Sequence, residues 1–278
     1  MSTVEQNQAV TRLPALREQT THPVRRKKQP RGNQFVGLIV PAAGLVLWEA
    51  LARAGVLPPN TLPAPTVVGQ TILDLGLSGD LWRHTAITLW RIITGFLLGA
   101  AVGTLLGGLT GYVAPARRLL DPLLQSLRNI PSMAWVPLFL LWLGIDESSK
   151  IGLISLGAFF PVYLNLSSGM SQVDPKLLEV GKIYRLSGLQ MIRRVILPAV
   201  LPEYIVGLRS GLGLAWMFVV AAEMMGASRG LGFLMIDGQM TGRASVILAS
   251  VILFAILGKI SDFLLEMAGR RLLSYKTR

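Results

Sequence analysis

Long apolar stretches recur along the chain and are separated by shorter polar segments. Six of them have roughly the 20 residues that a helix needs to cross the hydrocarbon core of a membrane. Because only helices and closed barrels satisfy all their backbone groups in lipid, the pattern predicts an all-α, polytopic membrane protein with six transmembrane helices. The predicted spans are Phe35–Ala54, Thr85–Tyr112, Leu124–Leu143, Ile151–Met170, Ile205–Gly226 and Ala244–Met267.

Glycines repeat within the second of these stretches. Gly99, Gly103 and Gly107 are four residues apart, so in a helix they lie on one face. In a membrane, small residues let two helix backbones approach closely. We therefore predict that this face packs against another helix, in preference to a role in binding a solute.

Composition and charge agree with this topology. Hydrophobic residues make up 51% and charged residues only 15% of the chain, whereas a soluble domain has about a quarter of charged residues. The N-terminal tail, the loops after the second and fourth stretches and the C-terminal tail together hold 18 basic residues, and the other loops hold four. Cytoplasmic segments carry the excess of Lys and Arg, so both termini are expected in the cytoplasm. The net charge of +12 is thus a topology signal, and no nucleic-acid partner is expected.

The predicted organisation has four parts. Residues 1–33 are polar and basic and are expected to form a disordered cytoplasmic tail. Residues 34–84 hold a peripheral transmembrane helix and an external segment. Residues 85–267 form the core, which includes a cytoplasmic loop at 171–203, and residues 268–278 form a second cytoplasmic tail. A cleaved signal peptide is not expected, because the basic segment before the first apolar stretch is too long for one.

The long cytoplasmic loop has the pattern of two short helices. Asp174 is a good N-cap and Pro175 suits the first helical position, so one helix is expected from there to a turn at Gly188. A second helix is expected over Leu189–Leu197 and stops at Pro198. Such helices either offer a surface to a partner or pack on the cytoplasmic end of the bundle, and the residues alone leave both interpretations open.

No motif of an enzyme is present in the sequence. The chain has no cysteine and two histidines, which excludes thiol chemistry and argues against a metal cluster. Gly181-Lys182 and Gly258-Lys259 lack the upstream glycine and the following Ser or Thr of a phosphate loop. We therefore expect no catalytic residue, no metal and no cofactor, so the energy for uphill transport must come from ions or from another subunit.

Several charged residues lie within or beside the predicted spans, where they are costly and so become functional candidates. Arg91 lies near the outer end of its span and can extend to the surface. Glu147 lies in a short external turn, where solvated charge is the ordinary explanation. Lys259, Asp262 and Glu266 share a helix face and are expected to form a ladder of ion pairs. No chain of carboxylates reaches the middle of the membrane, which disfavours a proton-coupled carrier.

Two prolines mark the start of the third stretch. Pro131 and Pro137 each remove a backbone donor and are expected to kink the helix. Broken helices in membranes are tolerated where they line a cavity or a pathway. We favour a gate or pathway role here over a passive kink.

A spaced motif stands in the long cytoplasmic loop. Glu179 is followed, at fixed distances, by Val195, Leu197 and Pro198. This arrangement resembles the pattern E-A-A-x3-G-x9-I-x-L-P, which is the signature loop of the permeases of binding-protein-dependent ABC importers.

The loop also departs from that pattern. Val180 and Gly181 replace the two alanines, which are small changes, and Arg185 stands where the family has glycine. The turn that the family glycine makes is therefore expected at Gly188 instead.

The resemblance extends over about residues 35–270 and is strongest to the aliphatic sulfonate permeases. Taurine, nitrate/bicarbonate and thiamine-precursor permeases are close relatives, and the stretch Gly144–Lys150 is more similar to the sulfonate branch. The segments that carry the resemblance are SGDLWRHTAITLWRIITGF (78–96), DPLLQSLRNIPSMAWVPLFLLWLGIDESSKIG (121–152), AWMFVVAAEMMGASRGLGFL (215–234) and ILGKISD (256–262).

This resemblance implies a type I ABC importer permease fold, with one peripheral span and a five-helix core. It implies a multi-pass protein of the inner membrane that forms a homodimer in membrane lipid, with the pathway on the two-fold axis. ATP-binding cassette ATPase subunits would bind below it and a solute-binding protein would dock outside. The implied function is import of aliphatic sulfonates by a subunit that is not itself an enzyme. The alternatives are the same class with taurine, nitrate/bicarbonate or another small solute, an ion-coupled secondary carrier, and a non-transport scaffold.

The resemblance also assigns roles to residues, with Asp174–Gly188 as the coupling helix that docks on the ATPase. The residues expected in this coupling are Asp174, Leu177, Leu178, Glu179, Gly181, Tyr184, Gly188, Leu197 and Pro198. The residues expected in the translocation pathway, placed by their positions in the helices, are Arg128, Pro131, Ser132, Trp216 and Glu223.

Overall fold

The computed structural model describes residues 36–273. The expected N-terminal tail, residues 1–33, and the last residues of the expected C-terminal tail lie outside the described residues. Two units are distinguished, residues 1–44 and residues 45–278. The described part of the first unit is the beginning of a single helix, and the second unit holds the later elements.

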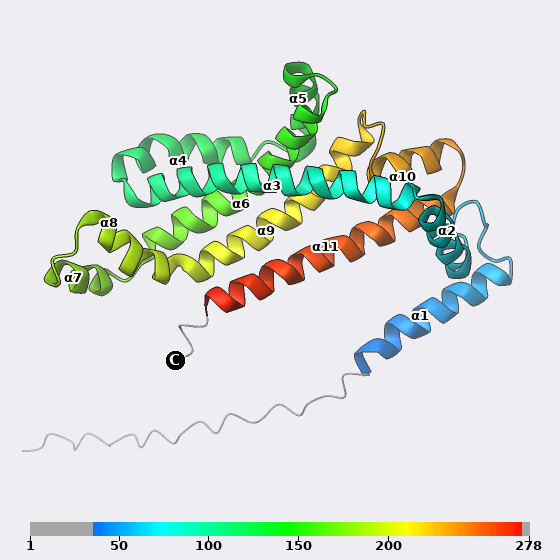
Figure 1. The fold of residues 1–278 in the computed structure, drawn as a ribbon, viewed down its shortest axis with the longest axis horizontal. Coiled ribbons are helices and arrows are strands. Elements are labelled where there is room, and N and C mark those ends of the chain that lie inside the picture. The colour runs from blue at the N-terminus through cyan, green and yellow to red at the C-terminus, as the bar shows by residue number, and fades with distance from the viewer. Residues whose placement is uncertain (1–35, 274–278) are drawn as a thin grey trace, which may run out of the picture. The chain divides into compact units, whose positions relative to one another are not determined.

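The expectation of an all-α fold is confirmed, because the described residues form helices and no strand (Figure 1). The helices that bear on the spans are α1 (Val36–Arg53), α2 (Pro65–Ser78), α3 (Asp80–Tyr112), α4 (Ala114–Arg128), η1 (Ser132–Ala134), α5 (Trp135–Leu143) and α6 (Glu147–Ser171). The remaining helices are α7 (Pro175–Ile183), α8 (Gly188–Met191), the π-helical η2 (Ile192–Ile196), α9 (Leu197–Met224), α10 (Leu231–Met240) and α11 (Ala244–Leu272).

Four helical runs within residues 36–273 are long and apolar enough to cross a membrane. They are α3, α6, the continuous run from α8 through α9, and α11. Each contains all or nearly all of one of the predicted spans and extends beyond it on at least one side. The helix α1 nearly coincides with the first predicted span, so the prediction differs from the structure chiefly in the third span.

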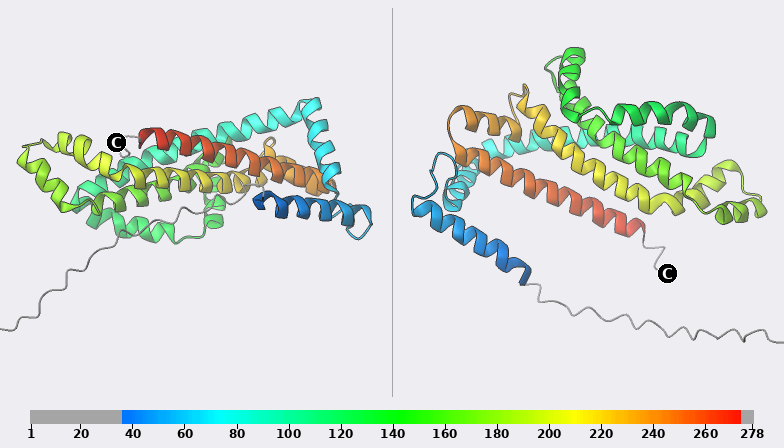
Figure 2. Two further views of the ribbon diagram at one scale, coloured as in Figure 1. Left: turned by 90° about the horizontal axis from the view of Figure 1, so that it is seen from below. Right: turned by 180° about the vertical axis from the view of Figure 1, so that it is seen from behind.

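The prediction of a continuous third span, Leu124–Leu143, is wrong. The helix α4 ends at Arg128, and α5 begins only at Trp135, after the short η1. Proline at position 131 has no N–H to donate and disfavours helical geometry in the residue before it. The chain therefore changes direction at this point, and α5 turns away from the line of α4 (Figure 1 and Figure 2). Ser132–Leu143 remains an apolar helix that is too short to span.

The prediction that the second loop helix stops at Pro198 is also wrong. The chain continues from α8 through η2 into α9 without a break. A proline ring clashes with the carbonyl group four residues earlier in a regular α-helix. The wider turn of a π-helix relieves this clash, so η2 lets Pro198 lie in the first turn of α9.

The centre of the second unit is the close contact of α3 with α6. A Cβ built at Gly99 would overlap the backbone carbonyl oxygen of Ser155 on α6. A Cβ at Gly103 would lie 2.9 Å from the carbonyl oxygen of Phe159, and one at Gly107 would lie 2.9 Å from that of Tyr163. The predicted packing role of the glycine face is therefore confirmed, with α6 as its partner.

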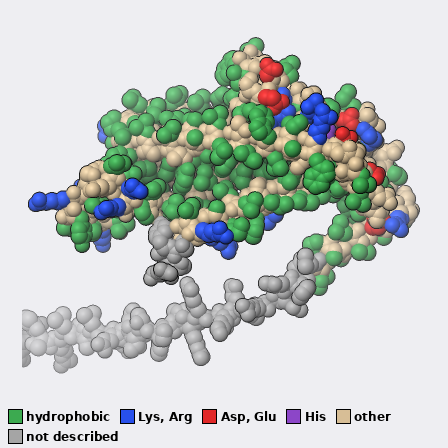
Figure 3. Space-filling model, viewed as in Figure 1, with side chains coloured by type: hydrophobic (Ala, Val, Ile, Leu, Met, Phe, Trp, Pro, Cys, Tyr) green, Lys and Arg blue, Asp and Glu red, His purple; other side chains and the backbone are tan. Residues whose placement is uncertain are grey.

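Side-chain type varies along the length of the second unit. Hydrophobic side chains cover much of the visible faces of the long helices, as expected for surfaces in contact with lipid or with another helix (Figure 3). The end that holds α7 and α8 shows Lys and Arg and no visible acidic side chain, whereas acidic side chains and further Lys and Arg lie together toward the opposite end. The end without visible acidic side chains is the one whose loop was predicted to be cytoplasmic from its excess of basic residues.

The glycine contact gives a direct test of what holds α3 against α6. We expect Gly99→Ala to destabilise the protein by about 3 kcal/mol, because overpacking a close helix contact forces the backbones apart. Thermal unfolding of the detergent-solubilised protein, followed by tryptophan fluorescence, measures the effect.

The matched control is Gly108→Ala on the same helix, where a Cβ would meet nothing within 4 Å. Alanine favours a helix over glycine by up to about 1 kcal/mol, so the control should be neutral or stabilising. Equal losses for the two variants would show that the α3–α6 contact is not the cause.

Candidate functional site

A cavity opens beside the break between α4 and α5. It has a volume of about 270 Å³. Arg128, the last residue of α4, and Ser132, the first residue of η1, line one side. Pro131 stands between them in the chain, so three of the five predicted pathway residues lie at this break. The remaining lining residues come from the α4–η1 linker, α5, α6 and α9 and are Ile130, Trp135, Leu156, Gly157, Phe160, Leu214, Met217 and Phe218.

The side chains that line this cavity carry one cation, one hydroxyl group and the indole N–H of Trp135, and the others are apolar. Arg128 is exposed, and among the described residues it has no ion-pair partner. Arg209 on α9 differs, because it binds Asp262 at 2.8 Å and Glu266 at 3.0 Å. The lining contains no pair of nucleophile and base, so the cavity suits the passage or binding of a small solute and not a chemical reaction.

The ion pairs of Arg209 also bear on the ladder that was predicted within α11 for Lys259, Asp262 and Glu266. Asp262 and Glu266 pair with Arg209 of α9, and Glu266 also pairs with Arg270 at 2.5 Å. The predicted ion pair of Lys259 with these carboxylates is therefore wrong. The carboxylates of Asp262 and Glu266 instead connect α11 to α9.

Trp216 lies away from the cavity at the break. Its side chain is buried, its Nε1 donates a hydrogen bond of 2.8 Å to the Ser261 hydroxyl, and its ring packs edge-on against Phe254. These contacts join α9 to α11. A place for Trp216 in the pathway stays a prediction.

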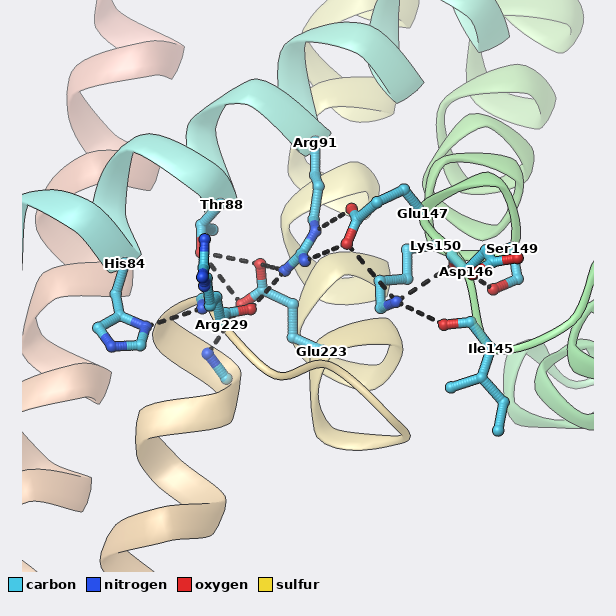
Figure 4. Close-up of polar contacts among 12 residues, drawn as sticks. His84, Thr88, Arg91, Ile145, Asp146, Glu147, Ser149, Lys150, Glu223 and Arg229 are labelled. Carbon is cyan, nitrogen blue, oxygen red and sulfur yellow. Dashed lines mark hydrogen bonds and ion pairs between the residues drawn. The ribbon is translucent and has the colours of Figure 1, made fainter.

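Glu223 also lies apart from the cavity, near the C-terminal end of α9, where it is 1% exposed (Figure 4). Its carboxylate accepts hydrogen bonds of 2.8 Å from Arg91, from the Thr88 hydroxyl and from the backbone N–H of Gly232. A buried charge is tolerated when it is paired and its oxygens are satisfied, and both conditions hold here. A place for Glu223 in the pathway stays a prediction.

Arg91 is the centre of this ionic cluster, which we define as Thr88, Arg91, Glu147, Lys150 and Glu223. Its guanidinium binds both oxygens of Glu147, at 2.7 and 2.6 Å, in addition to Glu223. It also donates to the backbone carbonyl of Arg229 at 2.7 Å. The cluster therefore ties α3 to α6, to α9 and to the loop that precedes α10 (Figure 4).

Two sequence-based interpretations are corrected by this cluster. Arg91 does not extend to the surface, because it is only 2% exposed. Glu147 keeps 47% of its side-chain surface exposed but serves as an ion-pair partner rather than as a solvated charge. One signal in the sequence could have predicted this cluster. Arg91, Glu147 and Glu223 all lie near the outer ends of predicted spans, where residues of opposite charge pair with one another.

The second predicted site is the long loop at 171–203 that was predicted to be cytoplasmic, and α7 forms there as expected. Asp174 caps the helix by accepting a hydrogen bond of 2.9 Å from the N–H of Lys176, and Pro175 is the first helical residue. Leu178 and Gly181 face the bundle. Leu178 packs on the cluster of Leu166, Ile196 and Val200, and a Cβ at Gly181 would lie 2.5 Å from the sulfur of Met191.

The other face of α7 is exposed and partly apolar. Leu177 is 45% exposed and Tyr184, which directly follows the helix, is 76% exposed. Glu179 is exposed on the same helix. One face of α7 therefore packs on the bundle, and the use of the exposed face by a partner stays a prediction.

The turn after α7 was expected at Gly188, and this prediction is wrong. Arg185 makes the turn instead. Arg185 has a φ of +50°, which is the left-handed conformation that usually requires glycine. The N–H of Leu186 bonds the carbonyl of Gly181 at 3.1 Å and that of Arg185 bonds Lys182 at 2.9 Å, which is the pattern of a Schellman motif. Gly188 instead begins α8, behind a capping box formed by Ser187 and Gln190.

The end of the motif also has a place in the structure. Leu197 and Pro198 form the first turn of α9, directly after η2. They therefore lie in the continuous helical run that leads from α8 to the cavity-lining part of α9.

Comparisons with known proteins agree with one another. Residues 87–274 match the family described as the binding-protein-dependent transport system inner membrane component. The chain is 41% identical over 253 residues to a protein of Bacillus subtilis described as an aliphatic sulfonates transport permease, SsuC, with 90% of this chain and 92% of the relative covered. It is 38% identical over 231 residues to the SsuC protein of Escherichia coli, with 83% and 88% covered.

Among solved structures, a chain in the inward facing MetNI methionine ABC transporter has a TM-score of 0.55 to this one. The match covers 73% of this chain and 96% of that chain, at 24% identity. At this identity the likeness shows the fold alone.

The ionic cluster predicts that its members contribute unequally to the free energy of unfolding. We expect Arg91→Leu to lower the free energy of unfolding by about 3–5 kcal/mol, because it leaves the buried carboxylate of Glu223 without a cation. Glu223→Gln should cost less, because Arg91 keeps Glu147. Thermal unfolding measures both variants.

The matched control is Arg243→Leu, which breaks the ion pair of 2.7 Å with Asp237 at a site where the two side chains are 56% and 35% exposed. Such exposed pairs contribute about 0–1 kcal/mol. A loss for Arg91→Leu no larger than that of the control would contradict the importance of the cluster.

The turn after α7 gives a further prediction. Arg185→Gly should be neutral or stabilising by about 1 kcal/mol, because glycine adopts the left-handed conformation without the steric cost that other residues have. Arg185→Val should be destabilising, since a β-branched residue is disfavoured there. Unfolding curves of the two variants, measured side by side, check the order.

Proposed function

Because this chain belongs to the family of binding-protein-dependent transport system inner membrane components, we propose that it conducts aliphatic sulfonates through the inner membrane as the permease subunit of an ATP-driven importer. Family membership makes it a multi-pass inner-membrane protein with the fold of type I ABC importer permeases. It is a transport subunit and not an enzyme. The observation that carries the choice of solute is the 41% identity to SsuC over 90% of the chain.

The partner that supplies energy is an ATP-binding cassette ATPase on the cytoplasmic side. The exposed face of α7, with Leu177, Glu179 and Tyr184, is the surface we assign to it. An exposed apolar side chain beside a charge suits a polar–apolar interface with a second protein. A solute-binding protein delivers the sulfonate to the other side of the membrane.

The transporter also needs a second copy of this chain, so that the pathway lies on a two-fold axis. The helices α4 and α5 support this, because they keep large apolar side chains exposed. Leu119 is 77%, Leu141 is 79% and Trp142 is 62% exposed. These side chains would pack against the second copy, with lipid around the pair, and in lipid such close packing is what holds helices together.

Transport proceeds by alternating access, and the helical run from α8 through α9 supports a route for the coupling. Gly181 of α7 lies against Met191 of α8, and α8 continues through η2 into α9. Leu214 and Met217 on α9 line the cavity at the α4–α5 break. A displacement of α7 by the ATPase would therefore pass through its contact with α8 and along the continuous helical run to the cavity.

The orientation with both termini in the cytoplasm completes the proposal. It rests on the excess of Lys and Arg in the alternate segments that include the α7–α8 loop. The same orientation brings α7 to the side where ATP is available.

The rival explanation, an ion-coupled secondary carrier, has less support. Such carriers need acidic residues that can exchange protons or bind cations in the membrane. Glu223, Asp262 and Glu266 are each paired with an arginine, which leaves no relay through them.

The first experiment is the ATPase activity of the complete transporter in nanodiscs. Hydrolysis should rise when the cognate binding protein is loaded with an alkanesulfonate. Glu179→Arg should abolish this stimulation, because it reverses a charge on the surface assigned to the ATPase.

The matched control is Arg271→Glu, which reverses a charge near the end of α11 on the same side of the membrane and should leave stimulation intact. Stimulation by a different solute only would overturn the assignment to sulfonates. Transport that follows an ion gradient with no bound ATPase would overturn the importer itself.

A further inference from the structure

The cavity at the α4–α5 break lies at a depth that belongs to the hydrocarbon core. Gly157 is ten residues from the start of α6, and Met217 is seven residues from the end of α9. At 1.5 Å per residue these positions are about 15 Å and about 10 Å from the outer ends of their helices. Since the hydrocarbon core is about 30 Å thick, the cavity lies well inside it.

Arg128 brings an uncompensated charge to this depth. It lies 14 residues, or about 21 Å, from the start of α4. Arg91 and Arg209, which also lie in long helices, are each bound to two carboxylates, whereas Arg128 has no partner among the described residues. A lone charge at membrane depth is costly unless it meets water or a counter-ion, so the site selects for an anion.

The other lining residues determine which kind of anion fits the cavity. Ser132 adds a hydroxyl donor four residues after Arg128, and a planar guanidinium binds oxyanions through more than one N–H. Phe160, Met217 and Phe218 add apolar side chains to the lining. A volume of about 270 Å³ exceeds the ~150 Å³ of a dry protein cavity that holds benzene, so an organic group of several carbons fits beside the charged head.

We propose that this cavity is a transmembrane binding site for an alkanesulfonate. Arg128 and Ser132 bind the sulfonate head, and Phe160 and Met217 contact the alkyl chain. The inference rests on the proposed function for its choice of solute class. It adds that the permease itself selects for an anionic head joined to an apolar tail, in addition to any selection by the binding protein. A small inorganic anion such as nitrate lacks the apolar part that most of the lining would contact.

The test measures binding to the permease–ATPase complex in phosphatidylcholine nanodiscs, without the binding protein and without ATP. The probes are radiolabelled alkanesulfonates of increasing chain length. We expect affinity to rise about fourfold for each methylene that enters the cavity. An uncharged alcohol of equal chain length should not compete, because it cannot satisfy Arg128.

Arg128→Gln should weaken sulfonate binding about tenfold or more, because charge-assisted hydrogen bonds are lost. Arg128→Lys should keep part of the affinity. Arg118→Gln removes an exposed cation from the same helix outside the cavity and should change nothing. Leu214→Trp narrows the cavity and should weaken the longest chains selectively, so it tests the site even if Arg128→Gln does not fold.

Two results would overturn the proposal. One is unchanged affinity in Arg128→Gln, and the other is an unchanged chain-length profile in Leu214→Trp. A parallel experiment measures whether the sulfonate-loaded binding protein stimulates the wild-type ATPase. It separates a failure of the proposed binding site from a failure of the proposed function. If the wild type responds to sulfonate while both variants bind it normally, the cavity is not the site but the importer stands. If the wild type responds only to another solute, the sulfonate assignment fails for both.

Discussion

The contact between α3 and α6 is the constraint on which the second unit depends. Gly99, Gly103 and Gly107 remove the side chains that would separate the two helices, so the backbones meet along much of their length. In lipid there is no hydrophobic force between helices, and close packing with few interhelical polar contacts has to hold them. The ionic cluster around Arg91 lies toward the N-terminal ends of the same two helices, so charge fixes that end of the pair and close packing fixes the middle. By contrast, α4 and α5 pack on this pair at either side of a break, and the cavity opens where they diverge.

The sequence was informative wherever one physical effect dominates. Hydropathy alone located four of the long helical runs, because about 20 consecutive apolar residues have few alternatives to a span. The glycine spacing predicted a packed face, and Asp174 predicted the start of α7. The prediction of a continuous third span failed because hydropathy does not report the direction of the chain, which changes at Pro131 between α4 and α5. The predicted stop at Pro198 failed for the opposite reason, since the helix continues there through the π-helical η2.

Residues whose roles depend on distant partners were harder to interpret. Arg91 was expected to extend to the surface, since its carboxylate partners lie 56 and 132 residues away in the chain. The turn was expected at Gly188 and not at Arg185, yet the hydrogen bonds of the Schellman motif hold Arg185 in a conformation that its side chain disfavours. For the site itself, the position of Arg128 near a helix break was predictable, but its lack of a partner became visible only in three dimensions. The coupling surface was suggested by a resemblance, and the division of α7 into a packed and an exposed face came from the structure.

The π-helical η2 has a consequence for the rotational phase of α9. One residue of an α-helix corresponds to a turn of about 100° around its axis, and a π-helical segment shifts the phase of the helix after it relative to the helix before it. Gly207 and Gly211 thereby face α6, where a Cβ would lie 3.1 and 2.9 Å from its carbonyl oxygens. A regular α-helix over the same residues would change the rotation of α8 relative to the helix face that carries these glycines. The five residues of η2 therefore set the angle at which one continuous helical run presents α8 to α7 and the glycines of α9 to α6.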